Sequence, residues 1–458
     1  MIELGLVRIH KLLVHTSLPW RAIHVAGTNG KGSVCAYVSA MLTHYNTSEL
    51  IRHTGHKPIV HARFTSPHLI DRWDCITINE NVVSKSTFDQ VEAQVKDRNL
   101  RNGIGASEFE VLTATAFEIF TRAKVDIGVV EVGMGGRLDA TNILGQPLPE
   151  DIETDLAGDW RSHRPLPLAT AITAIGLDHQ KFLGSSIEEI AREKAGILKP
   201  RVPVIAARQT ESAVERVLAE QASALSAGDV CFVSDKTTME HVWTENGKPA
   251  VTAENQIIQA RWPNGAIAVQ LVWKALSQLG RLEGVPSALL IQTLKDICQI
   301  PGQTRWAGRL ETINLSPITS RKTTALLDGA HNAQSAQMLR NHLDQLGRER
   351  TTWIVAASQG KDLAEMLRIL LREGDTVFAV EFGPVDGMPW VMPQESLDIA
   401  KNASSLIHGQ HQAYGRDVLR AAKDASFKEG RIVIAGSLYL VGDVLRLLRQ
   451  FERGASQT

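Results

Sequence analysis

The sequence has little of what a disulfide scaffold, a zinc site or a nucleic-acid surface requires. Four cysteines occur among 458 residues, scattered and without a Cys-x-x-Cys pair. A disulfide framework or a zinc site is therefore not expected, and a reducing compartment fits. The net charge is −1, so no excess of positive charge suggests nucleic acid or a membrane surface as a partner. No apolar run is long enough to predict a membrane span.

Targeting signals are also weak. Residues 1–14 carry Glu3 and no small-residue cleavage signal, which is more typical of a short amphipathic helix than of a targeting peptide. We therefore expect a cytoplasmic protein, with a mitochondrial location left open. Hydrophobic residues make up 43% and charged residues 22%, which is ordinary for a globular protein with sizeable cores. This chain length suggests two or three domains.

One glycine-rich stretch has the features of a phosphate-binding loop. Apolar residues 23–26 lead into Gly-Thr-Asn-Gly-Lys-Gly-Ser at 27–33, and a helical run follows at 34–42. Glycines let the backbone approach phosphates, and the positive end of a helix favours an anion. Lys31 can neutralise terminal phosphates, and the Ser33 hydroxyl can reach a bound Mg²⁺. The spacing departs from GxxxxGK[ST], and the alternative is a turn that merely joins a strand to a helix.

Strands that alternate with helices predict an α/β fold with a parallel, doubly wound sheet. The strands expected in the first part of the chain are 75–78, 125–132, 169–177 and 202–207, and the helices are 86–98, 107–123, 186–198 and 211–226. A capping box at 185–188 opens the third of these helices. After a boundary near residue 300, the alternation restarts with strands at 323–327, 353–357, 376–380 and 432–435. We expect a domain over 1–300 and a smaller α/β domain over 301–458.

Residues 43–62 form a polar stretch with four histidines, which are His44, His53, His56 and His61. A metal cluster is one interpretation. No acidic or paired-ligand spacing supports a metal, so we expect a solvated surface insertion instead.

Three features of the first domain share the carboxyl ends of predicted strands, where doubly wound sheets bind their ligands. They are the loop at 27–33, Glu131, and Asp178 with His179. A carboxylate that ends an apolar strand is costly without a partner, and Mg²⁺ is a suitable partner because it takes oxygen ligands and bridges phosphates. The alternatives are a salt bridge of Glu131 with Arg137 and a packed or capping role for His179.

Six motifs in this order resemble the folylpolyglutamate synthase and dihydrofolate synthase family, relatives of the Mur ligases. They lie at 27–33, 65–69, 131–142, 176–179, 193–197 and 328–332, and residues 436–442 also match. The resemblance covers nearly the whole chain. It implies an ATP-dependent amide ligase, with an N-terminal doubly wound P-loop ATPase domain and a smaller C-terminal Rossmann-like domain that joins glutamate. ATP would phosphorylate a pterin-linked carboxylate, and the amine of L-glutamate would displace the phosphate.

The resemblance also implies roles for individual residues. The residues that match ATP-binding positions are Gly27, Thr28, Asn29, Gly30, Lys31, Gly32, Ser33, Asn264, Arg309, Asp328 and His331. Those that match Mg²⁺ ligands are Ser33, Ser66, Glu131 and His179. The pterin substrate would lie near Thr65, Ser66, Pro67, His68, Arg137 and Asp139. The catalytic positions would be Lys31, Lys194 and His179.

Some of these assignments have alternatives. Lys194 matches a lysine that the family carbamylates, which would turn a cation into an anionic oxygen ligand. The alternative is a surface lysine paired with Glu193. For Asp328 and His331 the alternative is a strand-end turn with a helix cap. The family's Gly-x-His-Gln-x-x-Asn stretch corresponds to 258–264, where Asn264 is kept and the His-Gln pair is missing, so nucleotide-base contacts there are in doubt.

The choice of substrate rests on a finer resemblance. Residues 71–76 resemble fungal-type dihydrofolate synthases, so we expect glutamate addition to 7,8-dihydropteroate. Chain extension on tetrahydrofolate, alone or in a bifunctional enzyme, is the alternative. The Ser-Pro-His-Leu turn argues against a Mur-type peptidoglycan ligase, and an inactive nucleotide-binding relative is the remaining class. The expected partners are ATP, Mg²⁺, L-glutamate and a pterin, bound to a monomer.

Overall fold

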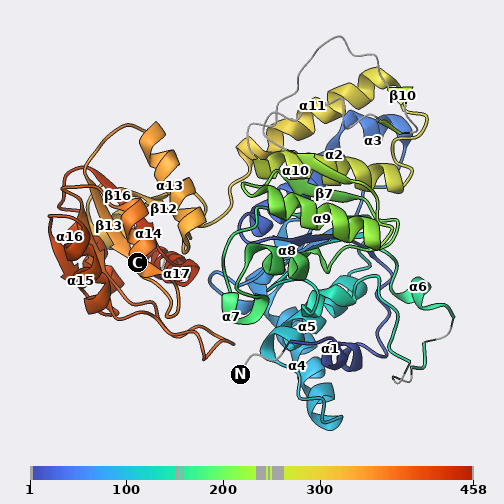
Figure 1. The fold of residues 1–458 in the computed structure, drawn as a ribbon, viewed down its shortest axis with the longest axis horizontal. Helices are drawn as coiled ribbons and strands as arrows, with labels where there is room; N and C mark the ends of the chain where they lie inside the picture. Colours follow the sequence, from blue (N-terminus) through green and yellow to red (C-terminus); the bar gives the residue numbers. More distant parts are fainter. Residues whose placement is uncertain are drawn as a thin grey trace. The chain divides into compact units, whose positions relative to one another are not determined.

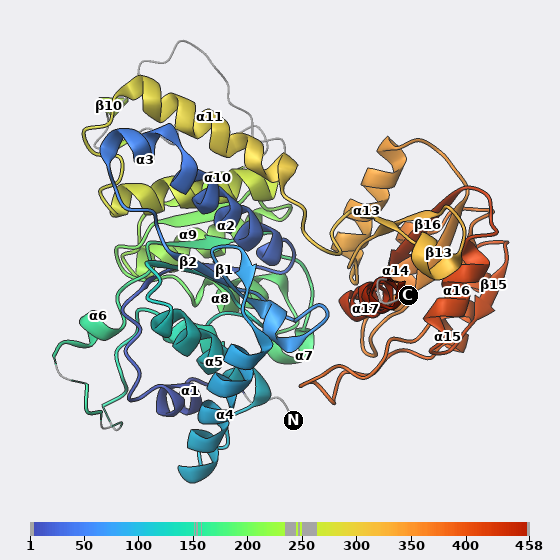
Figure 2. The ribbon, with the colours of Figure 1, turned by 180° about the vertical axis from the view of Figure 1, so that it is seen from behind.

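The chain forms two compact α/β units. The computed structural model describes residues 4–150, 152, 154–156, 158–233, 244–245, 248–249 and 263–455. Unit 1 consists of Met1–Pro67 and Trp73–Thr304, and unit 2 of His68–Arg72 and Arg305–Thr458. Each unit is a sheet with helices on both faces (Figures 1 and 2). The predicted α/β class is therefore confirmed.

The sheet of unit 1 has eight strands within the described residues, in the order β4-β3-β2-β5-β1-β6-β7-β8. They are β1 (Arg21–Ala26), β2 (His61–Phe64), β3 (Ile76–Ile78), β4 (Asn81–Val82), β5 (Ile127–Glu131), β6 (Ala169–Ile172), β7 (Val204–Ala207) and β8 (Val230–Val233). Pairing is parallel from β2 through to β8. Strands β3 and β4 add an antiparallel edge. The strand predicted around residues 75–78 is confirmed as β3, whereas β4 was not predicted.

Helices cover both faces of this sheet. One face packs against α2 (Lys31–Thr47), α3 (Glu49–Thr54), α10 (Pro263–Gln278) and α11 (Ser287–Gln303). The other face packs against α1 (Val7–Leu12), α4 (Lys85–Arg101) and α5 (Glu108–Arg122) at one end, and against α8 (Ile187–Ala195) and α9 (Ser212–Ala224) at the other. The strands between these layers are almost entirely apolar, as expected for a parallel sheet buried on both sides.

Shorter elements complete unit 1. They are the 3-10 turns η1 (Arg72–Cys75) and η2 (Ala140–Ile143), the helices α6 (Trp160–His163) and α7 (Gln180–Leu183), and a hairpin of β9 (Thr244–Glu245) and β10 (Lys248–Pro249). No helix within the described ranges is long and apolar enough to cross a bilayer.

The register of the sheet brings three loops together. Val25 on β1 pairs with Glu131 on β5 and with Ala171 on β6. Because all three strands are parallel, the segments that follow them leave the sheet at one edge. The loop at 27–30, the loop at 132–142 and the segment at 173–179 therefore share the carboxyl edge of unit 1.

Residues 43–62 are not the solvated insertion that their polarity predicts. The segment completes α2, forms α3 and opens β2. Leu50 is fully buried, and so is His61, whose ring nitrogens contact the hydroxyls of Ser39 and Thr43 at 3.1 and 3.0 Å. No group of three or more His, Cys, Asp or Glu in the described part of the chain could hold a metal ion. The prediction failed because one face of this polar segment packs on the core.

Two boundaries before the active-site region also differ from prediction. Strand β6 ends at Ile172 rather than at residue 177, because the carbonyl of Ala174 accepts hydrogen bonds from the loop after β1 instead of extending the ladder. The capping box of α8 lies one residue later than predicted, with Ser186 as N-cap and Glu189 as its partner. The prolines and charges of 145–168 predict a surface loop; the described residues of this range include the short helix α6, and Arg164 and Leu168 are buried.

Unit 2 is a second, smaller sheet with the order β11-β12-β16-β13-β14-β15. Its strands are β11 (Glu311–Asn314), β12 (Thr324–Leu327), β13 (Thr351–Val355), β14 (Thr376–Ala379), β15 (His411–Ala413) and β16 (Arg431–Ala435). Only β11 pairs antiparallel in this sheet. Strands β11 and β15 were not predicted from the sequence. Helices α13 (Ala333–Gln345), α14 (Leu363–Leu370) and α15 (Ser396–Leu406) pack on one face, and α12 (Ser316–Thr319), α16 (Val418–Ala425) and α17 (Leu438–Ala455) on the other.

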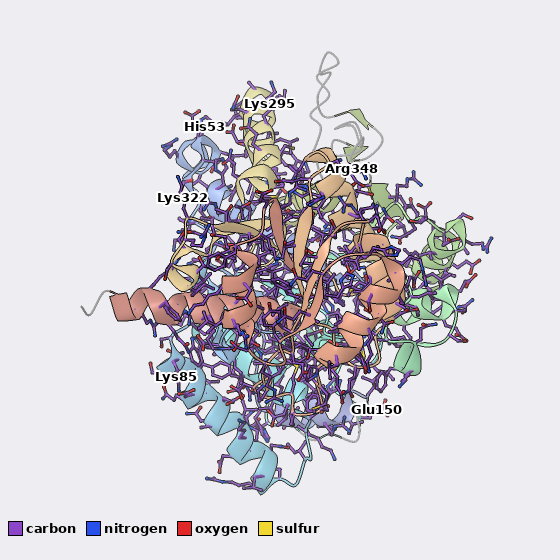
Figure 3. All side chains as sticks on the ribbon, turned by 90° about the vertical axis from the view of Figure 1, so that its left-hand side faces the viewer. His53, Lys85, Glu150, Lys295, Lys322 and Arg348 are labelled. Carbon is purple, nitrogen blue, oxygen red and sulfur yellow. The ribbon has the colours of Figure 1, made fainter. Side chains whose placement is uncertain are left out.

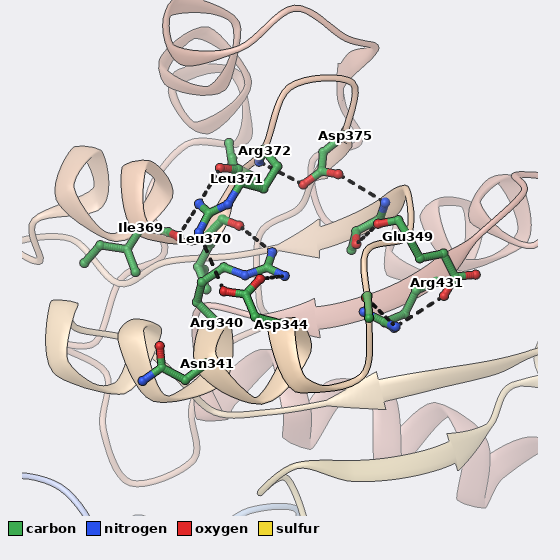
Figure 4. A network of polar contacts seen from close by, with 12 residues as sticks. Arg340, Asn341, Asp344, Glu349, Ile369, Leu370, Leu371, Arg372, Asp375 and Arg431 are labelled. Atoms are coloured by element: carbon green, nitrogen blue, oxygen red, sulfur yellow. Dashed lines mark hydrogen bonds and ion pairs between the residues drawn. The ribbon is translucent and has the colours of Figure 1, made fainter.

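A polar network closes the amino edge of this second sheet (Figure 4). Asp375 accepts hydrogen bonds from the backbone N–H of Thr351, at 3.1 Å, and from the indole of Trp353, at 2.9 Å. Arg340 donates to Leu370 O at 3.2 Å. These partners join the starts of strands to the helices beside them, so the network is structural and lies away from the carboxyl edge. Charged side chains such as Lys85 and Lys322 project outward from the ribbon instead (Figure 3).

The packing at Gly128 predicts a measurable cost for one added methyl group. A Cβ at this position of β5 would lie 2.6 Å from the Trp20 ring and 3.2 Å from Phe120. We expect Gly128→Ala to lower the free energy of unfolding by about 1–3 kcal/mol, because buried rings must shift. Chemical denaturation measures this change in the free energy of unfolding. Gly302→Ala in α11, where nothing lies within 4 Å of the new Cβ, is the matched control and should cost nothing. Equal losses would contradict the packing argument.

Candidate active site

The glycine-rich loop joins β1 directly to α2. Gly27 has φ +143° and Gly30, the N-cap of α2, has φ +94°. A Cβ on Gly27 would lie 1.8 Å from the Thr173 hydroxyl oxygen, and one on Gly30 would lie 2.6 Å from the Asn264 amide oxygen. Both positions therefore require glycine for conformation and for space. The predicted position Asn264 lies over the loop; residues 258–262, which precede it, fall outside the described residues.

The loop backbone is tied to the segment after β6. The N–H groups of Thr28 and Asn29 donate to the carbonyl of Ala174 at 2.9 and 3.2 Å. The Thr28 hydroxyl donates to Gly176 O at 3.0 Å, and Gly176 N donates back to that hydroxyl at 3.1 Å. Gly32 and Ser33 follow in the first turn of α2. The loop thus has a fixed shape with the start of a helix behind it, the arrangement that receives phosphates.

Lys31, Glu131 and Ser66 come together at this edge. The Lys31 ammonium lies 3.9 Å from a Glu131 carboxylate oxygen and donates to Thr28 O at 3.2 Å. The other Glu131 oxygen accepts from the backbone N–H of Ser66 at 3.2 Å, and the Glu131 side chain is 7% exposed. The alternative partner Arg137 pairs instead with Glu193 at 2.8 Å. Glu131 therefore faces the phosphate loop.

Lys194 is not the surface lysine of the alternative interpretation. It is 4% exposed, and its ammonium donates to the carbonyl of Gly27 at 2.8 Å. Burial lowers the pKa of Lys194 to about 7, and Lys31 lowers it further, while Asp178 and Asp139 act in the opposite direction. An amine with this pKa is partly neutral near pH 7, which makes it chemically reactive.

Asp178 and His179 lie beyond β6 rather than at its last residue. His179 adopts a left-handed conformation, with φ +53°, as the N-cap of α7, and its side chain is 45% exposed. Its Nε2 lies 4.0 Å from a carboxylate oxygen of Asp178, whose side chain is only 8% exposed. Asp178 acts on Lys194 electrostatically. The sequence places Asp178 at this edge with His179, but of these two the resemblance assigns a metal role to His179 alone. The sequence feature that could have identified Asp178 is its carboxylate, next to the predicted ligand His179.

The loop after β5 is held by buried polar side chains. One Asp139 oxygen accepts from Thr141 N at 3.0 Å and from the Thr141 hydroxyl at 2.6 Å, and the other accepts from Met134 N at 2.9 Å. Burial raises the pKa of Asp139. His24 on β1 contacts the Thr141 hydroxyl at 2.8 Å. Lys199 donates to the Asn142 amide oxygen at 2.6 Å.

Sequence reasoning missed His24 and Lys199. Each is almost completely buried, and nothing in a single sequence distinguishes a lysine four residues past a helix from a surface lysine. Of the predicted pterin positions, Thr65 is buried and Arg137 is exposed. Pro67 ends one segment of unit 1, while His68 belongs to unit 2 and is buried.

Unit 2 gathers three predicted residues at the carboxyl edge of β12 and β16. Asp328 accepts from the N–H groups of Leu310 and Ala330 at 2.9 and 2.8 Å, and burial raises its pKa while Arg309 acts in the opposite direction. His331 contacts Gly329 O at 2.8 Å through Nδ1. The residue after His331, Asn332, caps α13 together with Ser335. The turn-and-cap arrangement is thus present, with Arg309 beside it.

The residues present suit a phosphate-bound Mg²⁺ better than an all-protein metal cage. The four predicted ligands include one carboxylate and one imidazole, and the described residues hold no cluster of three metal-binding side chains. Mg²⁺ commonly takes one or two carboxylates and completes its shell with waters and phosphate oxygens. The loop, Lys31 and Glu131 define unit 1 as a P-loop nucleotide-binding domain, joined here to a second α/β unit.

Comparisons with known proteins identify the family. A family model described as the dihydrofolate synthetase C-terminal domain matches residues 311–447. The probable dihydrofolate synthetase of Schizosaccharomyces pombe is 33% identical over 98% of this chain and 99% of its own, and the dihydrofolate synthetase of Saccharomyces cerevisiae is 32% identical over 97% and 98%. The chain belongs to the dihydrofolate synthase and folylpolyglutamate synthase family, whose members are ATP-dependent ligases.

Solved structures support the fold. A bifunctional folylpolyglutamate synthase/dihydrofolate synthase of Yersinia pestis, complexed with AMPPNP and a Mn ion, superposes with a TM-score of 0.68 at 24% identity, covering 98% of this chain and 94% of that one. FolC of Escherichia coli in complex with DHPP and ADP gives a TM-score of 0.68 at 22% identity, with coverage of 98% and 94%. The two-unit architecture is therefore that of known folate ligases.

Buried Lys199 predicts a stability that depends on pH. Burial lowers its pKa from 10.5 to about 7. Between these values the unfolded chain binds more protons, so the contribution of Lys199 to the free energy of unfolding rises with pH. We expect the free energy of unfolding of the wild type, minus that of Lys199→Met, to increase by up to about 1.4 kcal/mol per pH unit above pH ~7. Denaturation at several pH values tests this, and a constant difference would show that the ammonium is not desolvated.

Proposed function

We propose that this protein joins L-glutamate to the carboxylate of 7,8-dihydropteroate, with ATP as the energy source and dihydrofolate, ADP and phosphate as products. The observation that carries the proposal is the match to two fungal dihydrofolate synthetases over 97–98% of this chain. The phosphate loop with Lys31 and Glu131 is the site at which such a reaction would begin.

Chemistry explains why ATP is needed. A carboxylate is a poor acyl donor because oxide is a poor leaving group. Transfer of the γ-phosphoryl group to a carboxylate oxygen breaks the bond to the β-phosphate oxygen and releases ADP. The amine of glutamate then attacks the carbonyl carbon of the acyl phosphate, the carbon–oxygen bond to phosphate breaks, and the nitrogen loses its proton. Such transfers depend on positioning and positive charge.

The loop and its neighbours supply these needs. The N–H groups at the start of α2 and the Lys31 ammonium would bind the phosphates, and Asn264 would hold the loop at Gly30. Ser33, Ser66, Glu131 and His179 would hold Mg²⁺, which supplies charge neutralisation to the phosphates when it is bound. Residues 1–300 would be the ATP-binding domain, and residues 301–458 the glutamate-ligase domain.

The remaining predicted residues keep their proposed roles. Arg309, Asp328 and His331 would contact the nucleotide from unit 2. Thr65 to His68, with Arg137 and Asp139, would form the pterin site. Because both Asp139 oxygens accept hydrogen bonds from their own loop, Asp139 would shape this loop as well as face the substrate.

Folylpolyglutamate synthesis is the second candidate function. The dihydrofolate synthase/folylpolyglutamate synthase of Bacillus subtilis is 27% identical over 98% of this chain and 96% of its own. Because this relative of similar length is named for both activities, we infer that one fold can bind either dihydropteroate or a reduced folate. We rank this activity second because the identity to the Bacillus subtilis protein, 27%, is lower than the 32–33% identity to the two fungal dihydrofolate synthetases.

The acceptor can be decided by turnover. With ATP, Mg²⁺ and L-glutamate present, ADP release should depend on dihydropteroate and not on tetrahydrofolate. Lys31→Ala should lower kcat by at least about 10²-fold, because the transferring phosphoryl group loses its nearest cation. Lys57→Ala, at an exposed lysine, is the control and should keep full activity. Release with tetrahydrofolate alone would shift the assignment to polyglutamylation, and release with neither would reject the ligase function.

Carbamylation of Lys194 is a further part of this proposal. Its neutral amine would attack carbon dioxide and lose a proton, giving an anionic oxygen beside the phosphate loop. The lowered pKa supports this, because the neutral form is present near pH 7. Activity should fall in buffer depleted of carbon dioxide and return with bicarbonate, and Lys194→Arg should be inactive at all bicarbonate levels. Bicarbonate-independent turnover would argue against a carbamate.

A further inference from the structure

The buried Lys199 amine forms a three-part junction with the amide of Asn142. Lys199 donates to the amide oxygen at 2.6 Å, and the amide nitrogen donates to Arg137 O and to Gly196 O, both at 3.0 Å. The Asn142 side chain, which is 1% exposed, makes all three of these hydrogen bonds. The junction links the loop after β5 to the residue that caps α8.

The same two segments are also in backbone contact. Arg137 N donates to Glu193 O at 2.8 Å. A Cβ on Gly136 would lie 2.7 Å from Lys194 O, and one on Gly196 would lie 2.3 Å from the Arg137 Cβ. Glycines at 136 and 196 thus allow the two backbone segments to pack so closely that neither can shift along the other. The position of the C-terminal turn of α8 therefore depends on the position of the loop at 136–142.

This turn carries Lys194, whose ammonium holds the carbonyl of Gly27 at 2.8 Å. Gly27 is the first residue of the phosphate loop, and it leads to Lys31 and Ser33. A continuous set of contacts therefore runs from Lys199 through Asn142 and the end of α8 to the phosphate loop. Lys199 itself contacts neither the loop nor the proposed pterin positions in this set.

We propose that Lys199 is a positioning residue, which acts through the Asn142 amide to hold Lys194 against the carbonyl of Gly27. This inference rests on the proposed function only for its kinetic readout. A charged donor fixes the orientation of the Asn142 amide, because the flipped amide would direct N–H groups at an ammonium. With the amide fixed, its two N–H groups can reach only the Arg137 and Gly196 carbonyls.

A labelling experiment tests the position of Lys194 without any substrate. An acetylating N-hydroxysuccinimide ester is applied in bicarbonate-free buffer, and acetylation of Lys194 is followed by peptide mass spectrometry. In the wild type, burial and the Gly27 hydrogen bond should make labelling slow. Lys199→Met should speed it about tenfold, because a hydrogen bond to a charged group is lost. Lys199→Gln keeps an N–H donor and should lie nearer the wild type.

Two further variants separate positioning from a general loss of stability. Asn142→Asp keeps an acceptor for Lys199 but removes both amide donors, so it should match Lys199→Met. Ser39→Ala removes a buried hydrogen bond to His61 elsewhere in unit 1 and should leave Lys194 protected. Unchanged labelling in Lys199→Met, or equal labelling in Ser39→Ala, would overturn the proposal.

Kinetics give the second readout. In Lys199→Met, kcat for dihydropteroate-dependent ADP release should fall about tenfold with the KM for L-glutamate unchanged, because the phosphate loop and not the glutamate site is displaced. A fall in kcat that Lys199→Gln does not partly restore would overturn the role of the hydrogen bond. If the wild type shows no turnover at all, the substrate assignment fails while the labelling result still decides the role of Lys199.

Discussion

The hydrogen bond from the Lys194 side-chain nitrogen to the carbonyl of Gly27 is the contact on which the candidate site depends. Gly27 has no side chain, and its φ of +143° is a conformation that glycine enters and leaves easily. The loop must therefore be fixed from outside. The carbonyl of Gly176, after β6, does so by accepting from the Thr28 hydroxyl, and Lys194 does so from α8. Without the second anchor, the loop that leads to Lys31 would lose its defined start.

This arrangement is costly in stability. Lys194 and Lys199 are both nearly buried, and burial lowers the pKa of each to about 7. A buried ammonium loses hydration that one hydrogen bond replaces only in part. Aliphatic side chains would pack in the same volume at lower cost. The site thus holds amines where a stability criterion alone would not place them, which is the usual mark of residues retained for function.

The sequence indicated the parts of the site that follow strands and missed those that support them. The loop at 27–33 and Glu131 were predictable because a parallel sheet brings the carboxyl ends of its strands to one edge. His24 and Lys199 were not, because their roles come from tertiary burial that leaves no periodic pattern. Residues 43–62 failed for the same reason, since one buried face inside a polar segment is hard to recognise. The unpredicted antiparallel strands β4 and β11 are short edge strands with weak sequence signals.

The missing His-Gln pair before Asn264 bears on a separate part of nucleotide recognition. Asn264 lies against Gly30 of the glycine-rich loop, so we expect it to act on the phosphates rather than on the base. Phosphate contacts act on the group that is transferred, and they can be stronger in the transition state than in the ground state. Base contacts are equal in both states and therefore affect only ATP binding. We therefore propose that the lack of the His-Gln pair changes how tightly ATP is held rather than the rate of phosphoryl transfer.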